Sequence, residues 1–243
     1  MDAFRLALAD DVAVLVRLHD RELDAATIAA LHDDGFPATL ALLPAGDAGE
    51  AALARMRGAV AGLSADPAHI DRLAADFAAI YLTGACGASP YESVWLHDEH
   101  LACQQPMFEL REIYAAAGLR VDDWRKRYDD HLVLQLQYLA QRLRSPQEDS
   151  TLATLGSFLD EHLGFWFPDF AGRVVARCDS DFYAALAALT AAWLERLRAV
   201  IEEVSGQSRP PRAMLEKTIK AKFAAETASV APLKFVPGGG AGC

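Results

Sequence analysis

The sequence lacks the features that identify several common protein classes. Its 243 residues include only four cysteines, Cys86, Cys103, Cys178 and Cys243, and no C-x-x-C pair. With no secretory signal pattern at the N-terminus, this usage predicts reduced thiols and a soluble, cytoplasmic protein. No apolar run reaches the roughly 18 to 20 residues that cross a bilayer, so we expect no membrane insertion.

Positive charge and phosphate-binding loops are also scarce. Lys and Arg total 23 against 34 Asp and Glu, which gives a formal net charge of -11. Because an acidic chain repels phosphate backbones, we expect no nucleic-acid partner. Neither G-x-G-x-x-G nor G-x-x-x-x-G-K-[ST] occurs, and we expect no cofactor. The same charge favours encounter with a basic peptide or protein.

What the chain has in abundance is helical periodicity. Hydrophobic residues make up 52% of it and recur at three- and four-residue steps, without a convincing run of alternating strand residues. We therefore predict an all-α protein, with a single globular domain of about ten helices. The expected helices cover about 3–23, 25–35, 48–63, 67–84, 96–117, 121–143, 146–163, 170–177 and 180–201, with caps at Asp24 and Asp66.

After Gly206 the composition changes. Residues 208–211 form a Ser-Arg-Pro-Pro linker, residues 212–226 are a basic stretch weakly suited to a helix, and residues 237–243 are rich in glycine. We expect a helical domain at 1–206 and an appendage at 207–243 whose tail is flexible.

One string has the composition of a metal site. His97, His100 and Cys103 are three residues apart, and Glu99 between them could act as a base in a metal-dependent enzyme. The spacing differs from H-E-x-x-H, which puts its two histidines four residues apart. A solvated helix start with one buried cysteine is the alternative interpretation.

The stretch from Gly84 to Trp95 is the one long loop within the apolar part of the chain. Its two glycines and its proline make it irregular, while Tyr91 and Trp95 make it apolar. Loops of this kind often bind partners, although the two aromatic rings could simply pack back onto the core.

Three separated strings, in order, resemble the TorD/DmsD/NarJ family of molybdoenzyme chaperones. The first is Tyr-Leu-Thr-Gly at 81–84 followed by Ser-Pro-Tyr-Glu-Ser-Val-Trp at 89–95. The second is Asp-His-Leu at 130–132, similar to the family's E-P-x-D-H motif, except that Arg127 and Tyr128 replace its glutamate and proline. The third is His-Leu-Gly-Phe-Trp-Phe-Pro-Asp-Phe at 162–170, which resembles H-L-x-x-W-x-P-x-F.

The resemblance implies a non-enzymatic role. Chaperones of this family bind the twin-arginine signal peptide, or the apo form, of a molybdenum-cofactor oxidoreductase, and delay its export until the cofactor is inserted. They also exchange helices between protomers, so a homodimer is an open alternative to a monomer. A generic helical adaptor without preference for a signal peptide is the third interpretation, beside the chaperone and the metal enzyme.

A receptor for such a peptide needs carboxylates beside an apolar groove, because the peptide has a basic region and an apolar core. On the resemblance, the expected peptide-binding residues are Pro90, Tyr91, Glu92, Ser93, Val94, Trp95, Asp129, Asp130 and His131. Among these, Glu92, Asp129 and Asp130 are the candidate arginine partners, and His131 is expected to orient Asp130 or to line the groove.

Overall fold

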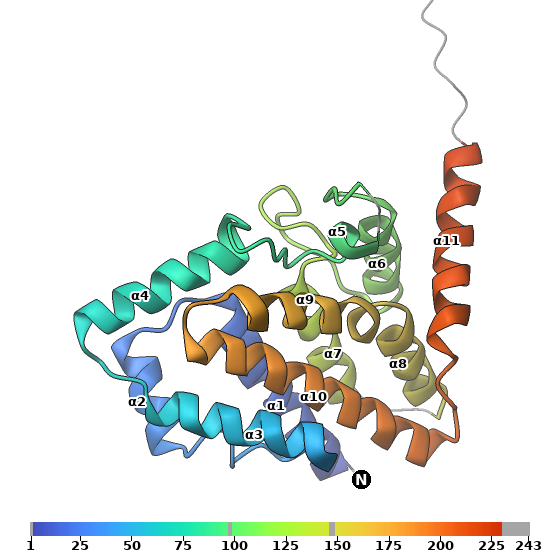
Figure 1. Ribbon diagram of the computed structural model, residues 1–243. Helices are drawn as coiled ribbons and strands as arrows, with labels where there is room; N and C mark the ends of the chain where they lie inside the picture. The colour runs from blue at the N-terminus through green and yellow to red at the C-terminus, as the bar shows by residue number, and fades with distance from the viewer. Residues whose placement is uncertain (1, 97–98, 146–148, 230–243) are drawn as a thin grey trace, which may run out of the picture. The chain divides into compact units, whose positions relative to one another are not determined.

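The computed structural model describes residues 2–96, 99–145 and 149–229 (Figure 1). Within these ranges all regular structure is helical, apart from one isolated antiparallel bridge between Tyr91 and His131. The expected all-α class is therefore confirmed. None of the described helices is both long enough and apolar enough to cross a membrane.

The chain divides between Arg209 and Pro210 into two compact units. The helices of the first unit are α1 (Asp2–Asp20), α2 (Ala25–Asp33), α3 (Gly46–Ala61), α4 (Pro67–Phe77), the π-helical turn η1 (Ala78–Leu82), α5 (Ser93–Leu96), α6 (Gln105–Ala116), α7 (Leu132–Arg144), α8 (Asp149–Glu161), α9 (Leu163–Arg177) and α10 (Asp181–Ser205). The second unit contains α11 (Arg212–Ser229). The expected glycine-rich tail, with Cys243, lies outside the described residues.

The core of the first unit is built around α10. This helix packs against α3, α8 and α9, while α1 packs against α7 (Figure 1). The largest fully buried side chains include Trp166, Phe167 and Phe170 of α9 and Tyr183 and Trp193 of α10. Burial of such aromatic surface is the main stabilising contribution to this arrangement.

Polar contacts set the ends of several elements. Asp24 accepts a hydrogen bond from Thr27 N at 2.7 Å and begins α2. Asp66 accepts hydrogen bonds from the first turn of α4. Both predicted caps are confirmed. Asp11 of α1 accepts hydrogen bonds from the backbone of residues 41 and 42 and from Trp193 Nε1, and so joins α1 to α10.

The predicted helix 96–117 is wrong in its first half. His100 and Cys103 have positive φ angles of 52° and 61°, which an α-helix does not accommodate. The helix begins only at Gln105, where Pro106 fits the first turn because its missing N–H would be unpaired there in any case. His100 and Cys103 therefore do not share a helix face.

The predicted helix 121–143 is also wrong in its first half. Gly118, with φ 72°, ends the preceding helix, and α7 begins at Leu132. The apolar spacing that included Trp124 is misleading, since that side chain is exposed rather than packed in the core. The end of the segment 119–131 instead contacts the loop at 84–95, through the side chains of Tyr128, Asp130 and His131.

The helix break expected at Pro168 occurs at His162 instead. α9 continues through Pro168 to Arg177 and includes the segment that was expected as a separate helix, 170–177. The proline removes one backbone hydrogen bond. The complete burial of Trp166, Phe167 and Phe170 around it offsets that loss.

Candidate functional site

The first two sequence strings meet in space. Glu92 N donates to Asp130 O at 3.1 Å and Leu132 N donates to Pro90 O at 2.8 Å, on either side of the bridge between Tyr91 and His131. Residues 90–92 are thereby held against residues 130–132, although 40 residues separate the two segments in the chain. We call the segment 89–96 the site loop.

Asp130 holds the C-terminal half of the site loop. Its Oδ2 accepts hydrogen bonds from Ser93 N at 2.9 Å and from Ser93 Oγ at 2.6 Å. Burial raises the pKa of Asp130 to about 6, although the hydrogen bonds from Ser93 act in the opposite direction. Its other oxygen, Oδ1, is buried without a hydrogen-bond partner among the described residues.

Glu92 links the loop to α7 and α9. Its Oε1 lies 2.9 Å from Nδ1 of His162, and its Oε2 accepts a hydrogen bond from Gln135 Nε2 at 2.9 Å. Gln135 Nε2 also donates to Asp130 O at 3.0 Å, and Gln135 Oε1 accepts from Trp166 Nε1 at 3.3 Å. All these side chains are buried, so each hydrogen bond satisfies a group that water cannot reach.

Asp129 faces α6. Its carboxylate accepts two hydrogen bonds from Arg111, from Nη2 at 2.8 Å and from Nε at 3.3 Å. Cζ of Arg111 lies 5.6 Å from the centre of the Phe108 ring and 5.2 Å from that of Trp124. Since Phe108 and Trp124 are both exposed, this ion pair anchors an aromatic surface next to the site.

His131 is the N-cap of α7. Its Nδ1 accepts a hydrogen bond from Val133 N at 3.1 Å, and its ring lies edge-on to Tyr91 with centroids 4.9 Å apart. Burial, with a smaller contribution from the charge of Arg127, lowers the pKa of His131 to about 3. The neutral imidazole contacts the site loop through Tyr91. The carboxylate of Asp130, which His131 was expected to orient, is held by Ser93.

The structure thus brings all nine expected residues together but leaves few of them open to solvent. Pro90, Glu92, Ser93, Asp129, Asp130 and His131 are buried. Tyr91, Val94 and Trp95 are half-buried, and Trp95 Nε1 donates to Ser89 O at 2.8 Å. The three carboxylates already have internal partners, so a peptide arginine would have to displace these partners to reach them.

Gln135, Arg111 and Trp166 belong to the site although they were not among the expected residues. Trp166 is the tryptophan of the third string, but the sequence assigned it no role in the site. The sequence offers one further signal for Gln135, an amide inside the otherwise apolar stripe of α7 between Leu132 and Leu139. A buried amide of this kind indicates that polar partners come from other elements.

The proposed metal string is only partly within the described residues, because His97 lies outside them. Within residues 2–96, 99–145 and 149–229, no group of three or more His, Cys, Asp or Glu side chains is arranged to hold a metal ion. His100 Nδ1 contacts Val94 O at 2.8 Å, and Cys103 Sγ donates to Met107 Sδ at 3.6 Å.

Comparison with known proteins finds relatives that are named as chaperones. Proteins named chaperone protein TorD are 32% identical over 140 residues in Vibrio cholerae, 31% over 160 residues in Shewanella sp. strain ANA-3, and 34% over 143 residues in Shewanella oneidensis. These alignments cover 54%, 63% and 56% of this chain. They span 63%, 74% and 64% of the relatives' own lengths.

A family model described as nitrate reductase delta subunit matches residues 44–172. This range contains the site loop, the segment at 129–132 and the whole third string, which the fold joins into one buried network. The match covers more than half of the chain, and the resemblance noted in its sequence is confirmed: the chain belongs to the nitrate reductase delta subunit family.

Proposed function

We propose that this protein is a cytoplasmic chaperone for a molybdenum-cofactor oxidoreductase. It binds the twin-arginine signal peptide of that enzyme, its apo form, or both, and holds the client until the cofactor is inserted. In this role it carries out no catalysis. The observation that supports the proposal most is the family match over residues 44–172, together with relatives named as chaperones.

The site loop supplies the apolar part of the proposed binding surface. Tyr91, Val94 and Trp95 are half-buried, so each is held in place by the core and still presents part of its side chain to solvent. A preordered apolar surface loses little conformational entropy on binding, which favours affinity for an apolar peptide segment. Glu92, Ser93, Asp130 and His131 act in this proposal by holding the loop in its shape.

The test is a calorimetric titration of the full chain with a twin-arginine signal peptide from a neighbouring oxidoreductase gene. A peptide whose two arginines are replaced by alanine serves as the control, and both are titrated at low and moderate salt. We expect affinity that falls with added salt and with loss of the arginines, because the chain carries a net charge of -11. Equal affinity for both peptides would favour a generic adaptor instead.

Substitution in the loop separates binding from folding. We expect Tyr91→Ala to weaken peptide binding more than it lowers the melting temperature, because part of this side chain faces solvent. Asp130→Ala and His131→Ala should weaken binding through disorder of the loop. If binding survives the Tyr91 change in a well-folded variant, the loop packs the core and does not contact the client.

A further inference from the structure

A groove with a volume of about 660 Å³ runs beside α7, and its other lining residues come from the end of α6 and from residues 119–127. This volume is within the range of known ligand sites, about 300 to 1,000 Å³. The residues of α7 that line it are Leu134, Gln137, Tyr138 and Gln141. Their spacing of three and four residues places them on one face of the helix, over a length of about 10 Å.

The apolar part of the groove is held in place by the core. The ring of Tyr138 lies 5.2 Å from that of Tyr114 and 4.8 Å from that of Phe158, between centroids. Tyr138 is only 5% exposed, and its hydroxyl makes no hydrogen bond within the part of the chain that the structure describes. The half-buried Leu134 extends this surface along α7. A preordered apolar surface loses little conformational entropy when a ligand covers it.

Two amide side chains of α7 line the groove without partners. Gln137 and Gln141 are exposed, and neither side chain is hydrogen-bonded to another described residue. They are one turn apart, which separates them by about 6 Å along the helix. In an extended peptide, residues i and i+2 face the same way and are about 6.6 Å apart. Because an amide side chain both donates and accepts, as a peptide group does, the two glutamines match alternate residues of an extended chain.

The charges around the groove do not favour a basic ligand. Three basic residues, Arg120, Lys126 and Arg127, line it, against two acidic ones, Asp122 and Asp123. Arg127 is paired with a carboxylate of α1 at 2.6 Å, and Lys126 with Asp123 at 3.3 Å. The lining is therefore slightly positive on a chain whose net charge is -11. An arginine gains no attraction here, whereas an uncharged segment of peptide meets no repulsion.

The groove is continuous with the site loop. Arg127 lines the groove, and the ring of the next residue, Tyr128, lies 5.6 Å from that of Tyr91 in the site loop. Leu134 lines the groove two residues after the first residue of α7, whose N–H donates to Pro90 O at 2.8 Å. A single extended segment of a client can therefore contact both the groove and the site loop.

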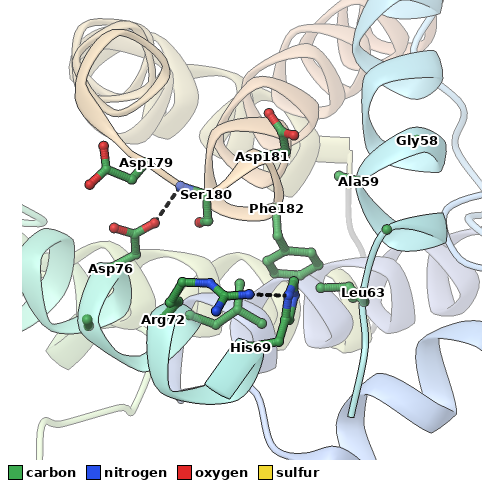
Figure 2. Close-up of a pocket in the computed structure, with 13 residues that line it drawn as sticks. Gly58, Ala59, Leu63, His69, Arg72, Asp76, Asp179, Ser180, Asp181 and Phe182 are labelled. Carbon is green, nitrogen blue, oxygen red and sulfur yellow. Dashed lines mark hydrogen bonds between the residues drawn. The ribbon is translucent and has the colours of Figure 1, made fainter. Parts of the chain in front are cut away.

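A second cavity, of about 400 Å³, lies where α3, α4 and the start of α10 meet, and it lacks these features (Figure 2). Figure 2 shows Asp76 directed at Ser180, whose N–H donates to Asp76 Oδ2 at 2.6 Å. It also shows Arg72 directed at His69, with 3.4 Å between Nη2 and Nδ1. These polar groups contact one another, whereas the amides of the groove are unpaired. The groove is therefore the better site for a peptide.

We propose that this groove binds an uncharged, extended segment of the client polypeptide, with the amides of Gln137 and Gln141 hydrogen-bonded to its backbone. An apolar side chain of the segment contacts Leu134 and Tyr138, and the segment continues toward Tyr91. This inference rests on the proposed function and adds a site for the backbone of the client. The groove has room for about three residues of an extended chain. Because its hydrogen bonds are to the backbone, segments of different sequence can share it.

The first experiment uses a probe that is not the client. The full chain, labelled with a nitrogen isotope, is titrated with N-acetyl-Val-Ala-Val methylamide, and the side-chain amide signals of glutamine are followed by NMR. The control is the same peptide with its backbone N–H groups methylated. We expect saturable shifts at Gln137 and Gln141 with the first peptide only. Shifts that do not saturate, that are absent at these two residues or that are equal with both peptides overturn the inference.

The second experiment uses matched variants and the signal peptide. Gln137→Met/Gln141→Met removes both amides without a change of charge and with little change of shape. The control Ala51→Met/Ala54→Met places the same side chains at exposed positions of α3, which does not line the groove. We expect the groove variant to bind the peptide about tenfold more weakly than the wild type, and the control to bind it unchanged.

The chain's own residues 230–243 are the competing occupant, and a chain that ends at Ser229 tests them. If they fill the groove, their removal shifts the side-chain amide signals of Gln137 and Gln141 and tightens binding of the probe, and the client is not the occupant. We expect neither change.

Failure of this inference and failure of the proposed function give different results. If the wild type and the groove variant bind the signal peptide equally well, the groove is not a client site, and the chaperone role is unaffected. If the probe shifts Gln137 and Gln141 but no signal peptide binds, the peptide groove is supported and the signal peptide is not the client segment. Melting temperatures of all variants establish that each is folded.

Discussion

At the scale of single residues, the three carboxylates beside the site loop differ in the partners that hold them. Asp129 is paired with a half-buried arginine, Asp130 with a serine, and Glu92 with a histidine and an amide. Of the three, substitution of Glu92 should destabilise the fold most, because two buried polar side chains are hydrogen-bonded to its carboxylate. Removal of one partner from a buried network leaves the others unsatisfied.

Glu92→Ala should therefore lower the free energy of unfolding by about 2 to 4 kcal/mol, measured by urea denaturation. His162 Nδ1 and Gln135 Nε2 would each lose a partner. Glu112→Ala, on the exposed face of α6, is the control and should change stability by less than about 0.5 kcal/mol. Equal effects of the two substitutions would show that the buried network adds little.

The raised pKa of Asp130 predicts that the stability of the protein depends on pH. Burial raises its pKa to about 6, above the value near 3.9 of an unfolded chain, so the folded state keeps a proton that the unfolded state has lost. The resulting stabilisation is fully present below about pH 4 and is lost as the pH rises through 6. Relative to Asp130→Asn, the wild type should lose roughly 2 to 3 kcal/mol between pH 4 and 7.

Urea denaturation at several pH values measures this difference, and other groups that titrate in both proteins cancel from it. The exposed Asp122→Asn variant should show no such trend against the wild type. A difference between wild type and Asp130→Asn that stays constant from pH 4 to 7 would mean that folding does not raise the pKa of Asp130.

At the scale of elements, α9 shows how packing overrides a local signal. The sequence pattern predicts a helix break at Pro168, which would divide the apolar residues of this segment between two helices. In the structure the chain turns at His162, and Gly164 lies so close to the preceding helix that an added Cβ would be 2.5 Å from Leu159 O. Gly172, later in the same helix, has nothing within 4 Å of that position.

Alanine at these two glycines should have opposite effects. Gly164→Ala forces α8 and α9 apart and should cost about 1 to 3 kcal/mol of stability. Gly172→Ala should stabilise the protein by about 0.5 to 1 kcal/mol, since alanine is the better helix former and meets no obstacle. Thermal and urea unfolding of both variants would check this. A stable Gly164→Ala protein would contradict the close approach of the two helices.

At the scale of the whole molecule, the end of the first unit is decided by contacts of residues 207–209. Gln207 O accepts a hydrogen bond from Arg198, which is buried and paired with Asp160. Arg209 contacts Asp160 at 3.2 Å and Glu195 at 2.8 Å. The composition change after Gly206 predicted a boundary there, whereas these contacts belong to the body of the first unit.

Truncation tests where the unit ends. A chain that stops at Arg209 should be more stable than one that stops at Gly206 by about 1 to 3 kcal/mol, because the shorter chain leaves Arg198 and Asp160 with fewer partners. Urea unfolding of the two truncated chains, with the full chain as reference, measures the difference. Equal stability would place the boundary at 206, as the composition alone predicted.

Much of the fold could be predicted from local patterns. The helical class, the caps at Asp24 and Asp66, and the long helix before Gly206 follow from periodicity and from side chains that bond their own backbone neighbours. The first halves of two predicted helices were wrong, because periodicity alone does not distinguish a core face from an exposed side chain such as Trp124. The nine expected site residues did come together, since the family strings mark them.

By itself, the sequence determined that the protein is all-α and acidic and that its three strings belong to one family, because these properties depend on composition, periodicity and residue order. Only the tertiary structure decided which charges are available to a partner. Burial pairs Glu92, Asp129 and Asp130 with internal donors, while Asp179 and Asp181 stay exposed around the start of α10. Solvent access depends on contacts between distant segments, and local sequence does not encode it.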